Sequence, residues 1–217
     1  MPTEDIENYA SFHTSPESKV LIELNRETHL KMMYPSMLAG HLQGKLLELI
    51  SCMIKPLTIL EIGTFTGYST ICLAKGLHPG GCIYTIERNS ELKETALKYF
   101  EKAGIVDSIV YYTGEAADII PAINEDFDLV YIDGDKKDYP LFYKLVIDKV
   151  KPGGLIIADN VLWYGKVIND QKCMDKDTLG IHKFNETVNN DEGVENLLLP
   201  FRDGLMLIRK RGPENIV

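Results

Sequence analysis

The fold class of this chain is decided by residues 57–67, which read LTILEIGTFTG. The first part is a short apolar run that ends at Gly63, and such a run indicates a buried strand. The residues from Gly67 onward, GYSTICLAKGL, have the pattern of a helix. A strand that passes through a glycine-containing turn directly into a helix predicts an α/β fold.

The same alternation continues toward the C-terminus. Further strands are expected at CIYTIE, SIVYYTG, FDLVYID and GGLIIAD, and helices at SELKETALKYFEKAG, EAADIIPAI, YPLFYKLVIDKV and TLGIHKFNETVNND. The last segments, VENLLLPF and GLMLIRK, predict an antiparallel hairpin because only a short gap separates them. We therefore expect a Rossmann-like, seven-stranded, mostly parallel sheet with right-handed crossovers, helices on both faces and an antiparallel last strand.

The residues before this alternation, 1–55, are expected to form a helical N-terminal extension. Helical patterns occur in TEDIENYASFH, SPESKVLIELNRETHLKMM and AGHLQGKLLELISCMI. In the second of these, Ser15 is expected to cap the helix with Pro16 at its first position.

Length and composition favour one domain over residues 1–217 and a soluble, cytoplasmic protein. The net charge is −9, which disfavours binding to a nucleic acid backbone. No apolar run is long enough to span a membrane, and the acidic N-terminus is unlike a signal peptide. The four cysteines form no C-x-x-C pair, so reduced and partly buried thiols are expected.

Every predicted parallel strand ends in an acidic residue. These residues are Glu61, Glu87, Glu115, Asp133 and Asp159. Because ligands of open α/β sheets bind at the carboxyl ends of the strands, the five acids are expected to lie at the functional edge.

The glycine loop and the next strand end predict an adenosine cofactor. The loop has the spacing G-x-x-x-G, with Phe65 where a dinucleotide-binding loop has its second glycine. Together with the charge of Glu61, this favours a cofactor with a cationic amino acid part and no phosphate. Glu87 lies about 20 residues further on, where an acid accepts ribose hydroxyls in NAD and S-adenosylmethionine (SAM) sites alike. The alternatives are a strand–helix turn that needs two glycines and an exposed acid.

Asp133, Asp159 and Asn160 provide three oxygen donors at two strand ends. Two carboxylates and an amide suit a hard divalent ion such as Mg²⁺, with Mn²⁺ or Ca²⁺ as alternatives. Lys136, three residues after Asp133, would become a base if a nearby cation lowered its pKa. The alternatives are turn and cap roles for the acids and an ordinary loop position for the lysine.

The motifs LEIGTFTGYST, YTIE, YIDGDKKDY, GGLIIADNVLWYG and RDGLMLIRK together resemble the cation-dependent SAM O-methyltransferases of the caffeoyl-CoA and catechol type. The resemblance runs from about Met37 to Lys210. It implies cofactor contacts at Met37, Glu61, Gly63, Thr64, Ser69, Glu87, Ala116, Asp133 and Asp135. It implies cation ligands at Asp133, Asp159 and Asn160.

The same resemblance implies that Lys136 and Asp133 are catalytic. Trp163 follows the D-N motif, so it is either a wall against a flat aromatic substrate, together with Tyr164, or a core residue. The N-terminal helices are implied to cover the substrate pocket and to form a homodimer. The expected acceptor is a small catechol-like molecule.

Three other functions compete with this one. A methyltransferase acting on nucleic acid would need a basic face and a pocket for a flipped base. A nicotinamide dehydrogenase is disfavoured by the glycine spacing. A non-catalytic cofactor-binding module is disfavoured by the intact set of acids and lysine.

Overall fold

The computed structural model describes residues 4–212, so the ends of the predicted 1–217 domain and of the 1–55 extension lie outside the described residues. The strand order of the sheet is β3-β2-β1-β4-β5-β7-β6. This is the expected seven-stranded Rossmann-like arrangement. Within the described range, no helix is both long and apolar enough to cross a membrane.

The described residues divide into two compact units. The first contains residues 59–62 and those from Ala116 onward; the second contains the residues up to Thr58 and Gly63–Glu115.

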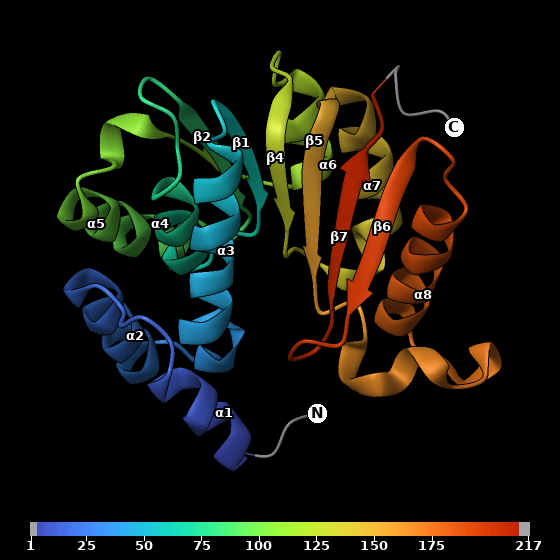
Figure 1. The fold of residues 1–217 in the computed structure, drawn as a ribbon, viewed down its shortest axis with the longest axis horizontal. Coiled ribbons are helices and arrows are strands. Elements are labelled where there is room, and N and C mark those ends of the chain that lie inside the picture. Colours follow the sequence, from blue (N-terminus) through green and yellow to red (C-terminus); the bar gives the residue numbers. More distant parts are fainter. Residues whose placement is uncertain (1–3, 213–217) are drawn as a thin grey trace. The chain divides into compact units, whose positions relative to one another are not determined.

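The first unit contains five strands and the helices between them (Figure 1). The strands are β1 (Thr58–Ile62, whose first residue belongs to the second unit), β4 (Phe127–Ile132), β5 (Val150–Asp159), β6 (Val194–Leu199) and β7 (Leu205–Lys210). The α-helices are α6 (Ala116–Ile119), α7 (Tyr139–Val146) and α8 (Lys176–Asn189). Short 3-10 turns are η4 (Ile120–Ala122), η5 (Lys136–Asp138), η6 (Ile147–Lys149), η7 (Trp163–Ile168) and η8 (Gln171–Cys173).

Strand directions in this unit follow the expected pattern. β4 pairs in parallel with both β1 and β5, whereas β7 is antiparallel to β5 and β6. The central strands are buried apolar runs, as parallel strands covered on both faces should be. β5 begins at Val150, earlier than the predicted GGLIIAD, because Val150 pairs with Phe127 before a register shift.

The second unit contains the N-terminal helices and the parallel pair β2 (Cys82–Glu87) and β3 (Ile109–Thr113). Its α-helices are α1 (Glu4–Phe12), α2 (Lys19–Lys31), α3 (Gly40–Ile54), α4 (Tyr68–Ala74) and α5 (Lys93–Ala103). Its 3-10 turns are η1 (Pro35–Met37), η2 (Ser90–Leu92) and η3 (Val106–Ser108).

The predicted cap of the second N-terminal helix was wrong. Ser18, not Ser15, caps α2, and its hydroxyl accepts from the N–H of Leu21 at 3.4 Å. The carbonyl of Ser15 instead lies 2.9 Å from Nε2 of His41 on α3. Residues 15–18 therefore remain outside the helix and connect to α3.

Candidate active site

The glycine loop, residues 63–67, turns the chain through three left-handed backbone conformations. They occur at Gly63 (φ 98°), Phe65 (φ 49°) and Gly67 (φ 92°). A Cβ on Gly67 would lie 2.5 Å from the ring of Phe100, so this glycine is also needed for packing against α5. The structural alternative for the two glycines is thus confirmed, and it does not compete with a cofactor role.

Glu87 holds the glycine loop through its carboxylate. The N–H of Phe65 donates to Oε2 at 2.8 Å and the N–H of Asn89 donates to Oε1 at 2.9 Å. The residue is buried, so the alternative of an exposed acid was wrong. The hydroxyls of Thr64 in the glycine loop and Thr85 on β2 lie 2.5 Å apart, so they also join the loop to the strand.

The other predicted cofactor residues of the second unit differ in their exposure to solvent. Ser69, in the first turn of α4, is buried, whereas Met37, at the end of η1, is 58% exposed. A hydrogen bond from Thr28 to Thr66, 3.1 Å long, ties α2 to the glycine loop.

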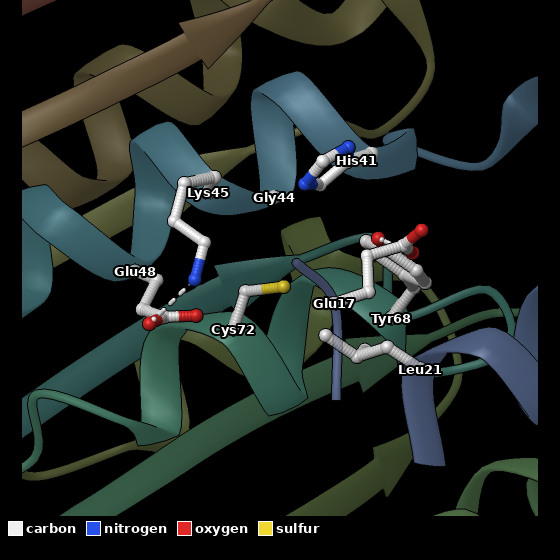
Figure 2. Close-up of a pocket in the computed structure, with 8 residues that line it drawn as sticks. All are labelled: Glu17, Leu21, His41, Gly44, Lys45, Glu48, Tyr68 and Cys72. Atoms are coloured by element: carbon white, nitrogen blue, oxygen red, sulfur yellow. Dashed lines mark hydrogen bonds and ion pairs between the residues drawn. The ribbon is translucent and has the colours of Figure 1, made fainter. Parts of the chain in front are cut away.

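The second unit also has a small pocket, which is separate from the predicted cofactor residues. It is lined by Glu17, Leu21, His41, Gly44, Lys45, Glu48, Tyr68 and Cys72 (Figure 2). Its polar groups are already paired, because Lys45 contacts Glu48 at 2.9 Å and the Tyr68 hydroxyl donates to Glu17 at 2.5 Å. Burial raises the pKa of Tyr68, which keeps that hydroxyl protonated. None of the predicted site residues lines this pocket.

In the first unit, an acidic cluster forms where β4 and β5 end. The parallel register pairs Ile132 with Ala158, so Asp133 and Asp159 follow at adjacent strand ends. The N–H of Asp133 donates to the carbonyl of Ile62 at 2.8 Å, which fixes the chain as it leaves β4.

Lys136 lies against this cluster and is 8% exposed. Its Nζ contacts Oδ1 of Asp133 at 2.7 Å and the hydroxyl of Tyr139 at 2.8 Å. The predicted catalytic pair is therefore in direct contact.

The charges of the cluster perturb one another. Burial raises the pKa of Asp133 to about 6 against the attraction of Lys136, and the nearby charge of Asp159 adds to the rise. Burial alone lowers the pKa of Lys136, but Asp133, Tyr139 and Asp159 raise it above its ordinary value. In the chain alone the amine is therefore an ammonium.

Asp159 is buried and accepts two hydrogen bonds. The hydroxyl of Tyr131 donates to Oδ2 at 3.2 Å, and the N–H of Asn160 donates to Oδ1 at 2.7 Å. Asn160 itself is left-handed, with φ 56°.

The donor set of this cluster fits a hard cation. The carboxylates of Asp133 and Asp159 repel each other, while Lys136 pairs with Asp133 and the charge of Arg202 also attracts it. Among residues 4–212, no group of three or more His, Cys, Asp or Glu is arranged to hold a metal. A divalent ion with oxygen preference matches the two carboxylates and the amide of Asn160.

A strained loop follows Asp159, the last residue of β5, and Asn160. Trp163 (φ 47°) and Tyr164 (φ 55°) are both left-handed, and their rings lie 5.4 Å apart. Trp163 is partly buried, whereas Tyr164 is 72% exposed. Such a conformation persists only where its surroundings hold it.

The segment before β7 holds this loop. Oδ1 of Asp203 accepts from the N–H of Tyr164 at 2.5 Å, and the carbonyl of Asp203 accepts from the N–H of Leu162 at 2.9 Å. Among residues 4–212, the buried Oδ2 of Asp203 has no hydrogen-bond partner, and burial raises the pKa of this carboxyl. A Cβ on Gly204 would lie 2.5 Å from the side chain of Leu162.

Three residues of this unit were missed by the sequence analysis: Tyr131, Tyr139 and Asp203. The available signals were an aromatic residue three positions after Lys136 and an Asp-Gly pair directly before the last strand. The remaining predicted residues of this unit are Glu61, which is fully buried in β1, Ala116, which is buried, and Asp135, which is partly exposed.

Comparison with known proteins identifies the class. The profile of the O-methyltransferase family matches residues 11–211, and the chain belongs to this family. The predicted family resemblance is therefore confirmed.

Individual relatives agree with this assignment. The chain is 31% identical to the catechol O-methyltransferase of Niastella koreensis, over 90% of both chains. It is 32% identical to caffeoyl-CoA O-methyltransferase 1 of Eucalyptus globulus, over 85% of this chain and 79% of that protein.

Solved structures also agree. The O-methyltransferase of Bacillus cereus in complex with SAH is similar with a TM-score of 0.90 and 30% identity, over 95% of this chain and 97% of that one. TomG of Streptomyces achromogenes, an O-methyltransferase in complex with SAM, has a TM-score of 0.89 and 29% identity, over 98% and 100% of the two chains.

Proposed function

We propose that this O-methyltransferase transfers the methyl group of SAM to one hydroxyl of a small, vicinal dihydroxy aromatic molecule, and that the reaction requires a divalent cation. The cluster of Asp133, Lys136 and Asp159 carries the proposal, because a buried lysine amine contacts the carboxylate of Asp133 and a second, buried carboxylate ends the neighbouring strand. The names of the catechol and caffeoyl-CoA relatives support the acceptor class.

The proposed cation ligands are Asp133, Asp159 and Asn160, and the ion is Mg²⁺, with Mn²⁺ or Ca²⁺ as substitutes. When bound, such an ion supplies Lewis acidity, which makes a hydroxyl of the acceptor easier to deprotonate. The contact of Nζ with Asp133 keeps the amine of Lys136 within this site.

In the proposed reaction, a bound cation would offset the carboxylate charges that hold Lys136 as an ammonium, so Nζ would lose one proton to solvent. As a neutral amine, Nζ then accepts the proton of the acceptor hydroxyl. The oxygen forms a bond to the methyl carbon while the bond from that carbon to sulfur breaks, leaving a methyl ether and SAH. Trp163 and Tyr164 are proposed to lie against the aromatic ring of the acceptor. They are the aromatic side chains with solvent access that follow Asp159 and Asn160 in the chain.

The proposed cofactor residues fall into two groups. Those of the first unit are Glu61, Ala116, Asp133 and Asp135, and those of the second are Met37, Gly63, Thr64, Ser69 and Glu87. The relatives solved with SAM and SAH support this cofactor. Glu87 is proposed to accept hydrogen bonds from the ribose hydroxyls while its carboxylate also accepts from the backbone N–H groups of Phe65 and Asn89, which holds the loop.

A homodimer also stays a prediction. It is supported by the apolar side chains of α1, where Ile6 is 57%, Tyr9 67% and Phe12 85% exposed. Light scattering on the purified chain measures the oligomeric state, and a monomer at micromolar concentration would contradict it. The cytoplasmic location likewise stays a prediction.

The function is tested by following SAH release from SAM with catechol as acceptor. We expect turnover with Mg²⁺ or Mn²⁺, none in EDTA, and little with phenol, which lacks the second hydroxyl. Equal turnover in EDTA would refute the cation requirement. Absence of turnover across a panel of catechols and catechol-bearing thioesters would refute the acceptor class.

A further inference from the structure

The hydroxyl of Tyr139 lies at the centre of the acidic cluster. It accepts from Nζ of Lys136 at 2.8 Å and faces the carbonyl oxygens of Ile132 at 3.1 Å and Asp159 at 2.9 Å. A phenol has one proton, so it donates to one carbonyl at a time while a lone pair accepts from the amine.

The ring of Tyr139 is fixed by packing. Its side chain is fully buried, and its ring meets that of Phe184 on α8 edge-to-face at 5.4 Å. Nζ of Lys136 lies 4.9 Å from the centre of the ring. The position of the hydroxyl is therefore determined by the core and not by solvent.

The two carbonyls belong to the ends of the strands that carry the proposed cation ligands. Ile132 is the last residue of β4 and directly precedes Asp133, and Asp159 is the last residue of β5. One buried hydroxyl thus contacts both strand ends and the lysine amine.

We infer that Tyr139 is a positioning residue, which sets the spacing of Asp133 and Asp159 for the cation and holds Nζ of Lys136 for proton transfer. The inference rests on the proposed function and adds a residue to it. As an ammonium, Nζ has three N–H groups, of which Asp133 and Tyr139 accept two. If a cation shared the charge of Asp133, Nζ would still keep its contact with the neutral hydroxyl of Tyr139.

The test compares Tyr139→Phe with a matched control, Tyr143→Phe. Tyr143 lies one turn later on α7 and packs on the same Phe184 at 5.9 Å, but its hydroxyl donates to Asp191 at 2.8 Å. Each variant removes one hydroxyl from the same helix, and only one of these hydroxyls contacts the cluster.

Three experiments are made: calorimetry gives the Kd for Mg²⁺, steady-state kinetics give kcat and KM with catechol and SAM, and thermal unfolding gives the midpoint. For Tyr139→Phe we expect about tenfold weaker Mg²⁺ binding and about tenfold lower kcat, the usual effect of losing a group that orients metal ligands, with KM for SAM unchanged. Tyr143→Phe should stay close to wild type in Mg²⁺ affinity and kcat, whatever its unfolding midpoint. If both variants bind Mg²⁺ and turn over alike, the inference is overturned while the proposed function stands. A wild-type protein without cation-dependent turnover would refute the function instead.

A double variant keeps the question measurable if Tyr139→Phe does not fold. In Lys136→Met with Tyr139→Phe, no ammonium is left against the phenylalanine ring. Its Mg²⁺ affinity should be about tenfold weaker than that of Lys136→Met alone, because the two strand ends lose their shared contact. Equal affinity of the two would overturn the role of Tyr139 at the strand ends.

Discussion

The N–H of Phe65 donates to Oε2 of Glu87 at 2.8 Å, so one carboxylate joins the glycine loop to the end of β2. The left-handed conformation of Phe65 directs this N–H, and Asn89 completes the arrangement from the other side. A residue proposed to bind ribose is thereby held in place before any cofactor arrives.

Replacing this carboxylate should weaken cofactor binding. We expect Glu87→Ala to lower the affinity for SAM by roughly 2–3 kcal/mol, because two hydrogen bonds to a charged acceptor are lost. Calorimetry measures the affinity, and Glu91→Ala, an exposed acid four residues on, is the control. Unchanged SAM affinity in a folded Glu87→Ala would leave Glu87 as a loop anchor only.

Removing a proposed cation ligand should abolish turnover without removing the cofactor. In Asp159→Ala, the Tyr131 hydroxyl and the Asn160 N–H lose their acceptor, and the site keeps one carboxylate. We expect no Mg²⁺-dependent methylation and nearly unchanged SAM binding. The control is Asp128→Ala on β4, where the carboxylate pairs with Lys151 at 2.9 Å. Methylation of catechol by Asp159→Ala at the wild-type rate would mean that the acid has a structural role.

Loss of the buried amine should slow the reaction. Lys136→Met keeps the apolar stem, and we expect kcat to fall about 10²–10⁴-fold, the usual range for a positioned base. Raising the pH should restore part of the rate, because more of the acceptor ionises without help. Lys137→Met, which changes an exposed lysine, is the control. A wild-type rate in Lys136→Met across the pH range would exclude this lysine as the base.

An ion-pair network in the second unit should make the free energy of unfolding fall at acidic pH. Glu27 of α2 accepts from Lys31 at 2.8 Å and from Lys98 at 2.6 Å, and the Tyr99 hydroxyl donates to it at 2.7 Å. These hydrogen bonds lower the pKa of Glu27 from 4.5 to about 2. The stabilisation is present above pH 4.5, the unfolded value, and is lost as the pH falls toward 2.

The free energy of unfolding, measured by urea titration between pH 5 and pH 3, should therefore fall more steeply for wild type than for Glu27→Gln. Glu94→Gln, an exposed glutamate of α5, should follow wild type. Parallel slopes for wild type and Glu27→Gln would show that the network adds no acid-sensitive stability.

Much of the fold could be predicted because the evidence was local. CIYTIE is apolar and β-rich, and β2 spans the same six residues, Cys82–Glu87. Gly104, the last residue of the predicted helical segment SELKETALKYFEKAG, ends α5 in a left-handed conformation. The start of α2 was missed because Ser15 and Ser18 are both plausible caps in sequence; in the structure the hydroxyl of Ser18 accepts from the N–H of Leu21, while the carbonyl of Ser15 contacts His41.

The candidate site shows the same division. Asp133, Lys136 and Asp159 could be predicted, because each lies at or just after a strand end that the pattern located. The roles of Tyr139 and Asp203 could not, because their partners are distant along the chain. Tyr139 meets the carbonyl of a residue 20 positions away, and Asp203 meets the N–H of a residue 39 positions away. Local periodicity contains no information on such pairings.

The contact between Gly204 and Leu162 has a consequence for protein engineering. No side chain fits at position 204 beside Leu162. The segments 160–165 and 202–204 therefore depend on each other's backbone position, and a change in one requires a compatible change in the other. An exchange of loops between relatives that moves only the tryptophan-bearing segment would bring a foreign backbone against an unchanged hairpin. Chimaeras made to alter acceptor preference should therefore transplant both segments together, or vary only the outward-facing side chain of Tyr164.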